Sequence, residues 1–226
     1  MTRPIKTNII MKNRILILTS FFLIFGMIGC TKFGKNITVN GRVLNPITNE
    51  PISDITVRLI KSKNLQYYGG YKTIKETTSD INGNFELSAG RTGGIWIVAD
   101  FNYQNYYELG WDYNEKYHSQ LKVDKGEIMH VDYHLVPYGE YRLIINNINC
   151  GGPNDTIIIN KTNFVQSFLD NDWMLTGCDG YTTSWNKVPM GNIHTKYTVI
   201  RNNISNTYQV NFMVHPNQNN EQVINY

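Results

Sequence analysis

Two stretches decide the fold of this chain: VNGRVLNPITNEPISDITVRLI, residues 39–60, and TTSDINGNFEL, residues 77–87. In the first, Val39 and Val43 alternate with polar residues, and the alternation returns in DITVRLI after a segment with two prolines and two asparagines. Alternation with a period of two predicts β-strands with one buried face, and the Pro/Asn segment predicts a turn between them. In the second stretch, an Asn-Gly pair before Phe85 predicts a hairpin.

The same short alternating pattern continues along the chain. Further strands are predicted in GGIWIVADF (93–101), EIMHVDYHLVP (127–137), IHTKYTVI (193–200) and NTYQVNFMV (206–214). Only residues 160–173 suggest a helix, and they lack a full amphipathic stripe. Short strands separated by turn residues predict an all-β protein built from sandwiches.

The two opening stretches resemble the carboxypeptidase regulatory-like domain, whose fold is a transthyretin-like β-sandwich. The matching features are Gly41-x-Val43, Glu50-Pro51-Ile52, Val57-x-Leu59, Thr78-x-Asp80-x-x-Gly83-x-Phe85 and the closing YHLVP at 133–137. The resemblance implies a first domain over residues 36–137, and the strand pattern then predicts a second small β-sandwich-like domain over 138–226. One continuous sandwich is the alternative. The regulatory-like domain is non-catalytic, so the resemblance supplies no functional residues.

The N-terminus has the features of an export signal. Four basic residues and no acidic one precede a 14-residue apolar run, Ile15 to Ile28. A membrane-spanning helix needs about 20 apolar residues, so the run has the length of a signal core. Met27-Ile28-Gly29-Cys30 resembles the lipobox of bacterial lipoproteins, which implies cleavage before Cys30 and acylation of that cysteine. An ordinary cleaved signal or an uncleaved anchor is the alternative, and translation can start at Met1 or Met11.

These features predict where the protein is located. Residues 1–29 are expected to be the signal peptide and residues 30–35 a lipidated tether, so the membrane lipid is a partner through acylated Cys30. The whole chain is similar to small lipoproteins of the Bacteroidetes, which implies the cell envelope, with the outer membrane preferred over the inner. The basic stretch CTKFGKN favours a periplasm-facing anchor.

The charge of the mature chain excludes one class of partner. Residues 30–226 contain 17 basic and 18 acidic residues, which gives a formal charge of −1 with neutral histidines. No Lys/Arg cluster remains after the signal. We therefore expect no nucleic-acid binding.

The other two cysteines, Cys150 and Cys178, are 28 residues apart. In an exported chain they are most simply a disulfide. Two thiols alone make an improbable metal site, and a catalytic cysteine would need a neighbouring base that sequence does not reveal.

Three polar residues form the only candidate for a metal or catalytic site that the sequence indicates. His130, Asp132 and His134 occupy alternate positions of a predicted strand, about 6.6 Å apart, opposite its apolar face. Two histidines and a carboxylate are suitable metal ligands, whereas the simpler interpretation is a solvated polar face.

In DINGNFE, residues 80–86, alternate Asp, Asn and Glu suggest the start of a calcium loop. However, Arg91 stands where that loop needs glutamate, so a hairpin turn is the better explanation.

An aromatic segment is the main candidate for binding. Residues 101–117 contain 7 aromatics among 17 residues, interleaved with amides and carboxylates. The candidate binding residues are Tyr103, Tyr106, Tyr107, Trp111 and Tyr113. Such rings stack on sugars or dock proteins, although they also fill sandwich cores.

Asp155-Thr156-Ile157 resembles the O-glycosylation acceptor of Bacteroidetes, which implies modification of Thr156.

Two classes of function follow. The first is a non-enzymatic, lipid-anchored envelope protein that binds a glycan or a protein, or has a structural role, without a cofactor. The second is a metal-dependent or hydrolytic enzyme that uses the His130/Asp132/His134 face. The sequence has no G-x-S-x-G, H-E-x-x-H, C-x-x-C, Walker or dinucleotide motif, and this favours the first class.

Overall fold

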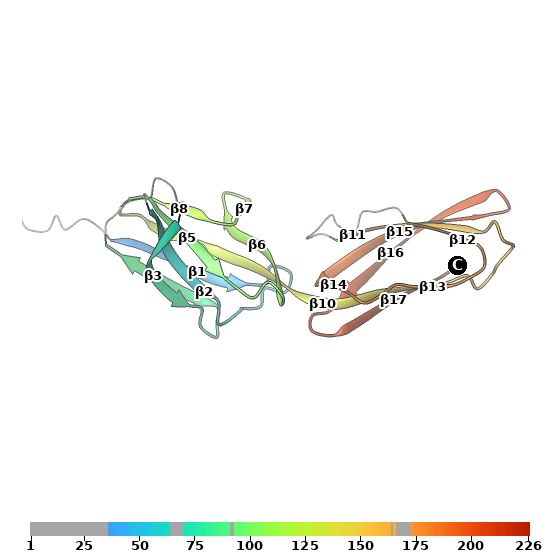
Figure 1. The fold of residues 1–226 in the computed structure, drawn as a ribbon, viewed down its shortest axis with the longest axis horizontal. Coiled ribbons are helices and arrows are strands. Elements are labelled where there is room, and N and C mark those ends of the chain that lie inside the picture. Colours follow the sequence, from blue (N-terminus) through green and yellow to red (C-terminus); the bar gives the residue numbers. More distant parts are fainter. Residues whose placement is uncertain (1–35, 64–69, 91–92, 164, 166–172) are drawn as a thin grey trace, which may run out of the picture.

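The computed structural model describes residues 36–63, 70–90, 93–163, 165 and 173–226. Within these residues every regular element is a β-strand, which confirms the all-β prediction (Figure 1). The first ten strands are β1 (Ile37–Leu44), β2 (Thr56–Lys63), β3 (Gly70–Thr78), β4 (Asn84–Ala89), β5 (Ile95–Asp100), β6 (Tyr106–Tyr113), β7 (Lys116–His118), β8 (Leu121–Val123), β9 (Ile128–His130) and β10 (Asp132–Asn146). The others are β11 (Thr156–Asn163), β12 (Trp173–Thr176), β13 (Tyr181–Thr182), β14 (Asn186–Pro189), β15 (Gly191–Arg201), β16 (Ile204–Val214) and β17 (Asn219–Asn225).

The first unit is a sandwich of two sheets. One sheet has the order β4-β1-β10-β6-β7, with β9 beside β1, and the other has the order β3-β2-β5-β8. The alternating apolar residues of both sheets meet in one core, whose largest fully buried side chains include Trp111 and Tyr133.

The predicted hairpin around the Asn-Gly pair is wrong, although the turn itself is present. The carboxylate of Asp80 accepts hydrogen bonds from the backbone N–H groups of Asn82 (2.9 Å) and Asn84 (2.7 Å), and Gly83 has a φ of 75°. However, β3 pairs with β2, and β4 pairs with β1 in the other sheet. The turn therefore crosses between the layers of the sandwich.

Gly41 allows a close backbone contact inside the first unit. A Cβ atom at this position would overlap the carbonyl oxygen of Val131, which lies at the break between β9 and β10. Next to it, the N–H of Arg42 donates to the carboxylate of Asp132 at 2.8 Å. The space that a side chain at position 41 would need is thus occupied by the backbone of Val131.

The second unit has its own core, formed by residues between 141 and 226. One layer has the order β12-β11-β15-β16, and the other consists of β10 with β13, β14 and β17. Strand β10 belongs to both units: residues 132–137 pair with β6, and residues 138–146 pair with β14, β13 or β17. Figure 1 shows the two units end to end, joined by this strand.

The segment considered as a helix is only partly described. Residues 160–163 are the end of β11, and Trp173 begins β12. The remainder of 160–173, except residue 165, lies outside the described residues. The helix interpretation is therefore wrong at both ends of the segment.

Candidate functional site

A polar cleft of about 160 Å³ lies where the two units meet. Its floor is the backbone of β10 around Tyr138, and its walls are the β5–β6 turn, the β16–β17 turn and Lys187 of β14. We call it the junction cleft and define it by its amide side chains, Gln104, Asn105, Asn217, Gln218 and Asn219, together with Tyr138, Glu140 and Lys187.

Hydrogen bonds hold the walls of the junction cleft to its floor. The N–H of Tyr138 donates to the carbonyl of Asn105 at 3.0 Å, and the N–H of Asn217 donates to the carbonyl of Tyr138 at 3.0 Å. The Lys187 ammonium donates to the carbonyl of Gln104 at 3.1 Å and so links the two units. These bonds place turns more than 100 residues apart in sequence on two sides of one strand.

Glycine at position 139 lets one wall approach the floor. A Cβ atom on Gly139 would overlap the carbonyl oxygen of His215, in the turn after β16. The side chain of Asn220 holds the same turn, because its Nδ2 donates to the carbonyls of Glu140 (3.0 Å) and His215 (2.9 Å). The amides of this turn, which line the cleft, are therefore displayed on a fixed backbone.

The five amide side chains of the junction cleft are free to bind a ligand. All five residues are exposed, and none of their side-chain amides hydrogen-bonds to another described residue. Each amide offers two donors and an acceptor. Tyr138, which also lines the cleft, is half-buried, and burial, together with the nearby Tyr107, raises the pKa of its hydroxyl, which stays protonated at neutral pH. The cleft thus presents several hydrogen-bond donors and acceptors beside a neutral tyrosine.

The three residues of the metal hypothesis do not converge on one point. His130 Nδ1 lies 2.9 Å from Asn40 Oδ1, the Asp132 carboxylate accepts from the backbone of Arg42, and His134 is only 8% exposed. Within the described part of the chain, no three His, Cys, Asp or Glu side chains form a group that could hold a metal ion. The geometry therefore gives this hypothesis no support.

His134 is buried, and not solvent-exposed as a solvated polar face would require, because the β6–β7 hairpin covers its side chain. Its Nδ1 lies 3.1 Å from the hydroxyl of Tyr117, whose ring meets the imidazole edge-on at 5.4 Å. Burial lowers the pKa of His134, and the carboxylates of Asp112 and Asp132 partly oppose this shift. A neutral imidazole packed under a tyrosine is a structural element of the first unit.

The predicted aromatic platform is divided in the structure. Trp111 is fully buried, with its ring 4.6 Å from Tyr133 and 5.7 Å from Phe85, so its assignment to binding is wrong. Its partner across the sheet is Tyr133, on the inner face of the sandwich. Tyr106 and Tyr107 are half-buried.

Only two of the five predicted rings are exposed, and they lie far apart. Tyr103 is 75% exposed before β6, and Tyr113 is 39% exposed at the other end of that strand. A strand of this length separates them by more than about 20 Å. One small ligand cannot contact both.

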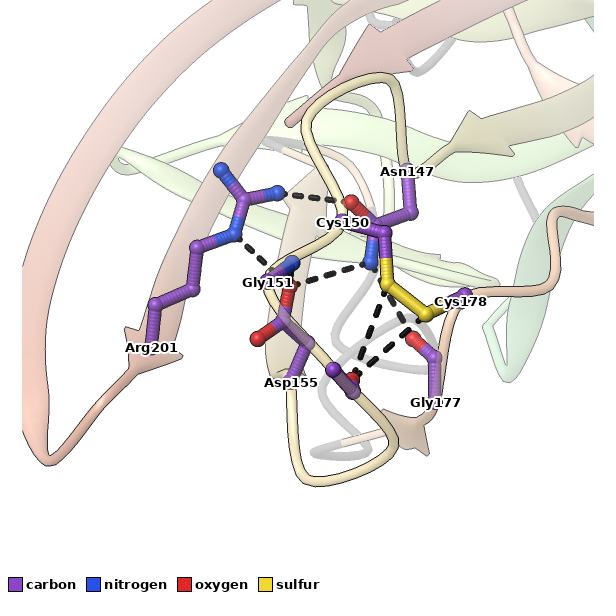
Figure 2. Close-up of a disulfide and its surroundings, with 8 residues drawn as sticks. Asn147, Cys150, Gly151, Asp155, Gly177, Cys178 and Arg201 are labelled. Atoms are coloured by element: carbon purple, nitrogen blue, oxygen red, sulfur yellow. Dashed lines mark hydrogen bonds and ion pairs between the residues drawn. A yellow bond between two sulfur atoms is a disulfide. The ribbon is translucent and has the colours of Figure 1, made fainter.

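The Cys150–Cys178 disulfide is confirmed, with Cα atoms 5.4 Å apart. Figure 2 shows it beside a polar network centred on Asp155, whose carboxylate accepts from Arg201 Nε (2.9 Å) and from the N–H of Gly151 (2.8 Å). The hydrogen bond from Gly151 is the main cause that lowers the pKa of Asp155, and those from Asn147 and Arg201 add to it. Together they outweigh desolvation, which would raise this pKa. The network and the disulfide fix the same loop of the second unit.

The proposed O-glycosylation acceptor adjoins this network. Thr156 is half-buried, and its hydroxyl donates to the carbonyl of Asn154 at 3.1 Å and lies 3.3 Å from Thr176 Oγ1. Cys30, the predicted lipidation site, lies outside the described residues. Among those residues, no helix is long and apolar enough to cross a membrane.

Sequence reasoning missed the junction cleft, and one signal for it was available. Asparagine and glutamine are concentrated in YQNYY at 103–107 and PNQNNEQ at 216–222, beyond what two turns require. Nothing in the sequence indicated that the two segments meet.

No protein-family model matches the chain, and no curated protein matches it. Similar solved structures include a streptococcal ancillary pilin, with 8% identity, 86% of this chain and 63% of the pilin covered, and a TM-score of 0.33. A DUF3823 family protein from Bacteroides uniformis has 11% identity, 79% and 99% coverage and a TM-score of 0.31. The minor pilin of Streptococcus agalactiae has 10% identity, 85% and 95% coverage and a TM-score of 0.30. The chain spans less than two thirds of the ancillary pilin, and these similarities assign no family to it.

Proposed function

We propose that this chain is a lipid-anchored, non-enzymatic protein of the cell envelope that binds a hydroxyl-rich ligand, such as a glycan, in the junction cleft. The observation that carries the proposal is the set of five exposed amides around Tyr138, none of which has a side-chain hydrogen bond within the part of the chain that the structure describes. Small-molecule sites occur preferentially at domain interfaces, in concave places where a few polar groups converge.

The chemistry of the junction cleft suits sugar hydroxyls. A hydroxyl both donates and accepts, and the side-chain amide has the same dual character. The ring of Tyr138 offers an apolar face for the C–H side of a sugar. Glu140 and Lys187 contribute one charge of each sign, so the cleft favours a neutral polar ligand over a strongly charged one.

In this proposal the anchor is acylated Cys30, and the short tether 30–35 connects it to β1. In Figure 1, β1 begins at the end of the first unit that is distant from the second unit. A membrane attached there would leave the junction cleft and the second unit directed away from the lipid. The sequence pattern of residues 36–137 supports kinship of the first unit with carboxypeptidase regulatory-like domains, and the similarity to small Bacteroidetes lipoproteins supports an outer-membrane location.

Glycan-array binding of the full chain in detergent tests the ligand proposal. Gln104→Ala and Asn219→Ala should each weaken binding about 2- to 10-fold, which is the usual value of one net hydrogen bond. Asn192→Ala is the matched control, because Asn192 is an exposed amide on β15 that does not line the cleft. Equal binding by all variants, or no glycan bound by the parent chain, would refute the proposal.

Membrane fractionation tests the anchor separately. Cys30→Ser should move the protein from the membrane fraction to the soluble fraction, and intact-mass measurement should show loss of the acyl groups. A protein that stays in the membrane with unmodified Cys30 contradicts lipidation but leaves the binding proposal intact.

A further inference from the structure

Strand β16 is a long, unprotected edge of the second unit. It comprises the 11 residues Ile204–Val214, and within the described residues it pairs only with β15. Eight consecutive residues from Ile204 are exposed, so both faces of the strand extend beyond the sandwich core. The sequence predicts a half-buried strand here, whereas Tyr208 is 48% and Val210 39% exposed.

The sequence of β16, ISNTYQVNFMV, contains no charged residue, proline or glycine. Edge strands are ordinarily protected from pairing by lysines, prolines or shortness. Other edges of this chain follow that rule: β3 contains Lys72, Lys75 and Glu76, and β12 has only four residues. The missing protection on β16 therefore distinguishes it from other edges of the same molecule.

The register of the β15–β16 hairpin identifies the backbone groups that face outwards. Asn202 and Asn203 have φ values of 48° and 64°, which form a two-residue turn closed by Arg201 and Ile204. Such a turn closes on a hydrogen-bonded pair, and these pairs recur at every second residue. Even-numbered residues of β16 therefore bond to β15, and residues 205, 207, 209, 211 and 213 direct their N–H and C=O groups to the open edge.

We propose that two copies of this chain dimerise by antiparallel pairing of their β16 strands, centred on Gln209. Centring on Gln209 uses all five outward residues, because 205 then pairs with 213 of the second copy and 207 with 211. About ten backbone hydrogen bonds would form. The contact is isologous, as a twofold axis requires.

The side chains agree with this register. Tyr208 lies opposite Val210 of the second copy at a close, non-hydrogen-bonded pair, and an aromatic beside a β-branched residue is a favourable cross-strand pair. Thr207 lies opposite Asn211, which joins two polar side chains on the other face. Because the strand is uncharged, no like charges meet when it pairs with itself.

Sedimentation of the full chain in detergent over a wide concentration range tests the dimer. Gln209→Lys places two ammonium groups side by side at the twofold axis and should weaken dimerisation about tenfold or more. The matched control is Met174→Lys, which adds the same charge at an exposed site on the opposite edge strand. A monomer at every concentration, or an oligomer insensitive to Gln209→Lys, overturns the proposal.

Cysteine cross-linking tests the register and does not depend on the effect of a new charge. In the proposed dimer, residue 209 faces itself with Cα atoms about 5.5 Å apart, within the range of a disulfide. Gln209→Cys should therefore form a covalent dimer on mild oxidation. Ser205→Cys should not, because it faces Met213 of the second copy. Equal cross-linking of both variants would contradict the register, and glycan binding is not required for either result.

Discussion

Removal of the Cys150–Cys178 disulfide should destabilise the second unit and leave the first unchanged. The cross-link closes a loop with a sequence separation of 28. The loop-entropy relation gives about 3.6 kcal/mol for a loop of this size. Both cysteines belong to the second unit, whose core is separate from that of the first. The double variant Cys150→Ser/Cys178→Ser should therefore lose about 3.6 kcal/mol in that unit alone.

The loop should keep its position in the folded variant, because other bonds hold it. Asn147 Nδ2 donates to the carbonyl of Gly177 at 3.1 Å, and Arg201 pairs with Asp155 (Figure 2). The variant is thus expected to fold at neutral pH with the same strands. The cost then comes from the freedom that the unfolded chain gains.

Urea unfolding measures the cost, and hydrogen exchange locates it. With an m-value of about 1.5 kcal/mol/M, the unfolding midpoint of the second unit should fall by about 2.4 M. Exchange should accelerate in β11 and β15 and stay unchanged in β1 and β6. A loss below about 1 kcal/mol, or equal loss of protection in both units, would show that loop entropy is the wrong explanation.

Three further predictions concern single residues. Trp111→Ala should cost the first unit about 3–5 kcal/mol in urea unfolding, while exposed Tyr113→Ala should change its stability by less than about 0.5 kcal/mol. Gly41→Ala should destabilise the first unit by at least about 2 kcal/mol, because the methyl group overlaps a carbonyl, and an unchanged melting temperature would contradict this. The pKa of Asp155 lies below its ordinary value of 3.8, so its stabilising effect is complete above that pH and is lost as the pH falls below it. Asp155→Asn should therefore flatten the acid side of a stability–pH curve and lower stability at pH 7, and an unchanged acid limb would contradict the assignment.

The sequence predicted strands well because a half-buried strand has a two-residue period. Pairing is a different matter, as the Asn-Gly turn at 82–83 shows. The residues from Asp80 to Gly83 favour a reversal of the chain, and the sequence therefore indicated the turn. Whether the next strand joins the same sheet depends on a partner distant in sequence, and here that partner is β1.

The sequence also did not predict which single aromatic residues are buried. Trp111 lies in a segment where polar residues are interleaved with rings, so its strand has no clear apolar face. Its burial follows from the strand opposite, where Tyr133 faces the core. His134 became buried for a similar reason, since a hairpin from residues 106–118 covers it. Both cases depend on tertiary neighbours that one strand's period does not encode.

The continuity of β10 bears on how the junction cleft would bind. Its 15 residues extend about 50 Å and belong to both cores. Met190 N–H also donates to the carbonyl of Pro137 at 2.8 Å, and Asn45 Nδ2 contacts Met190 Sδ at 3.0 Å. A cleft fixed by a shared strand and several cross-unit bonds does not have to close around its ligand, so little binding energy is spent on ordering the protein. The same rigidity would hold β16 at a constant orientation to the first unit, so the first units of a strand-paired dimer would take one fixed arrangement.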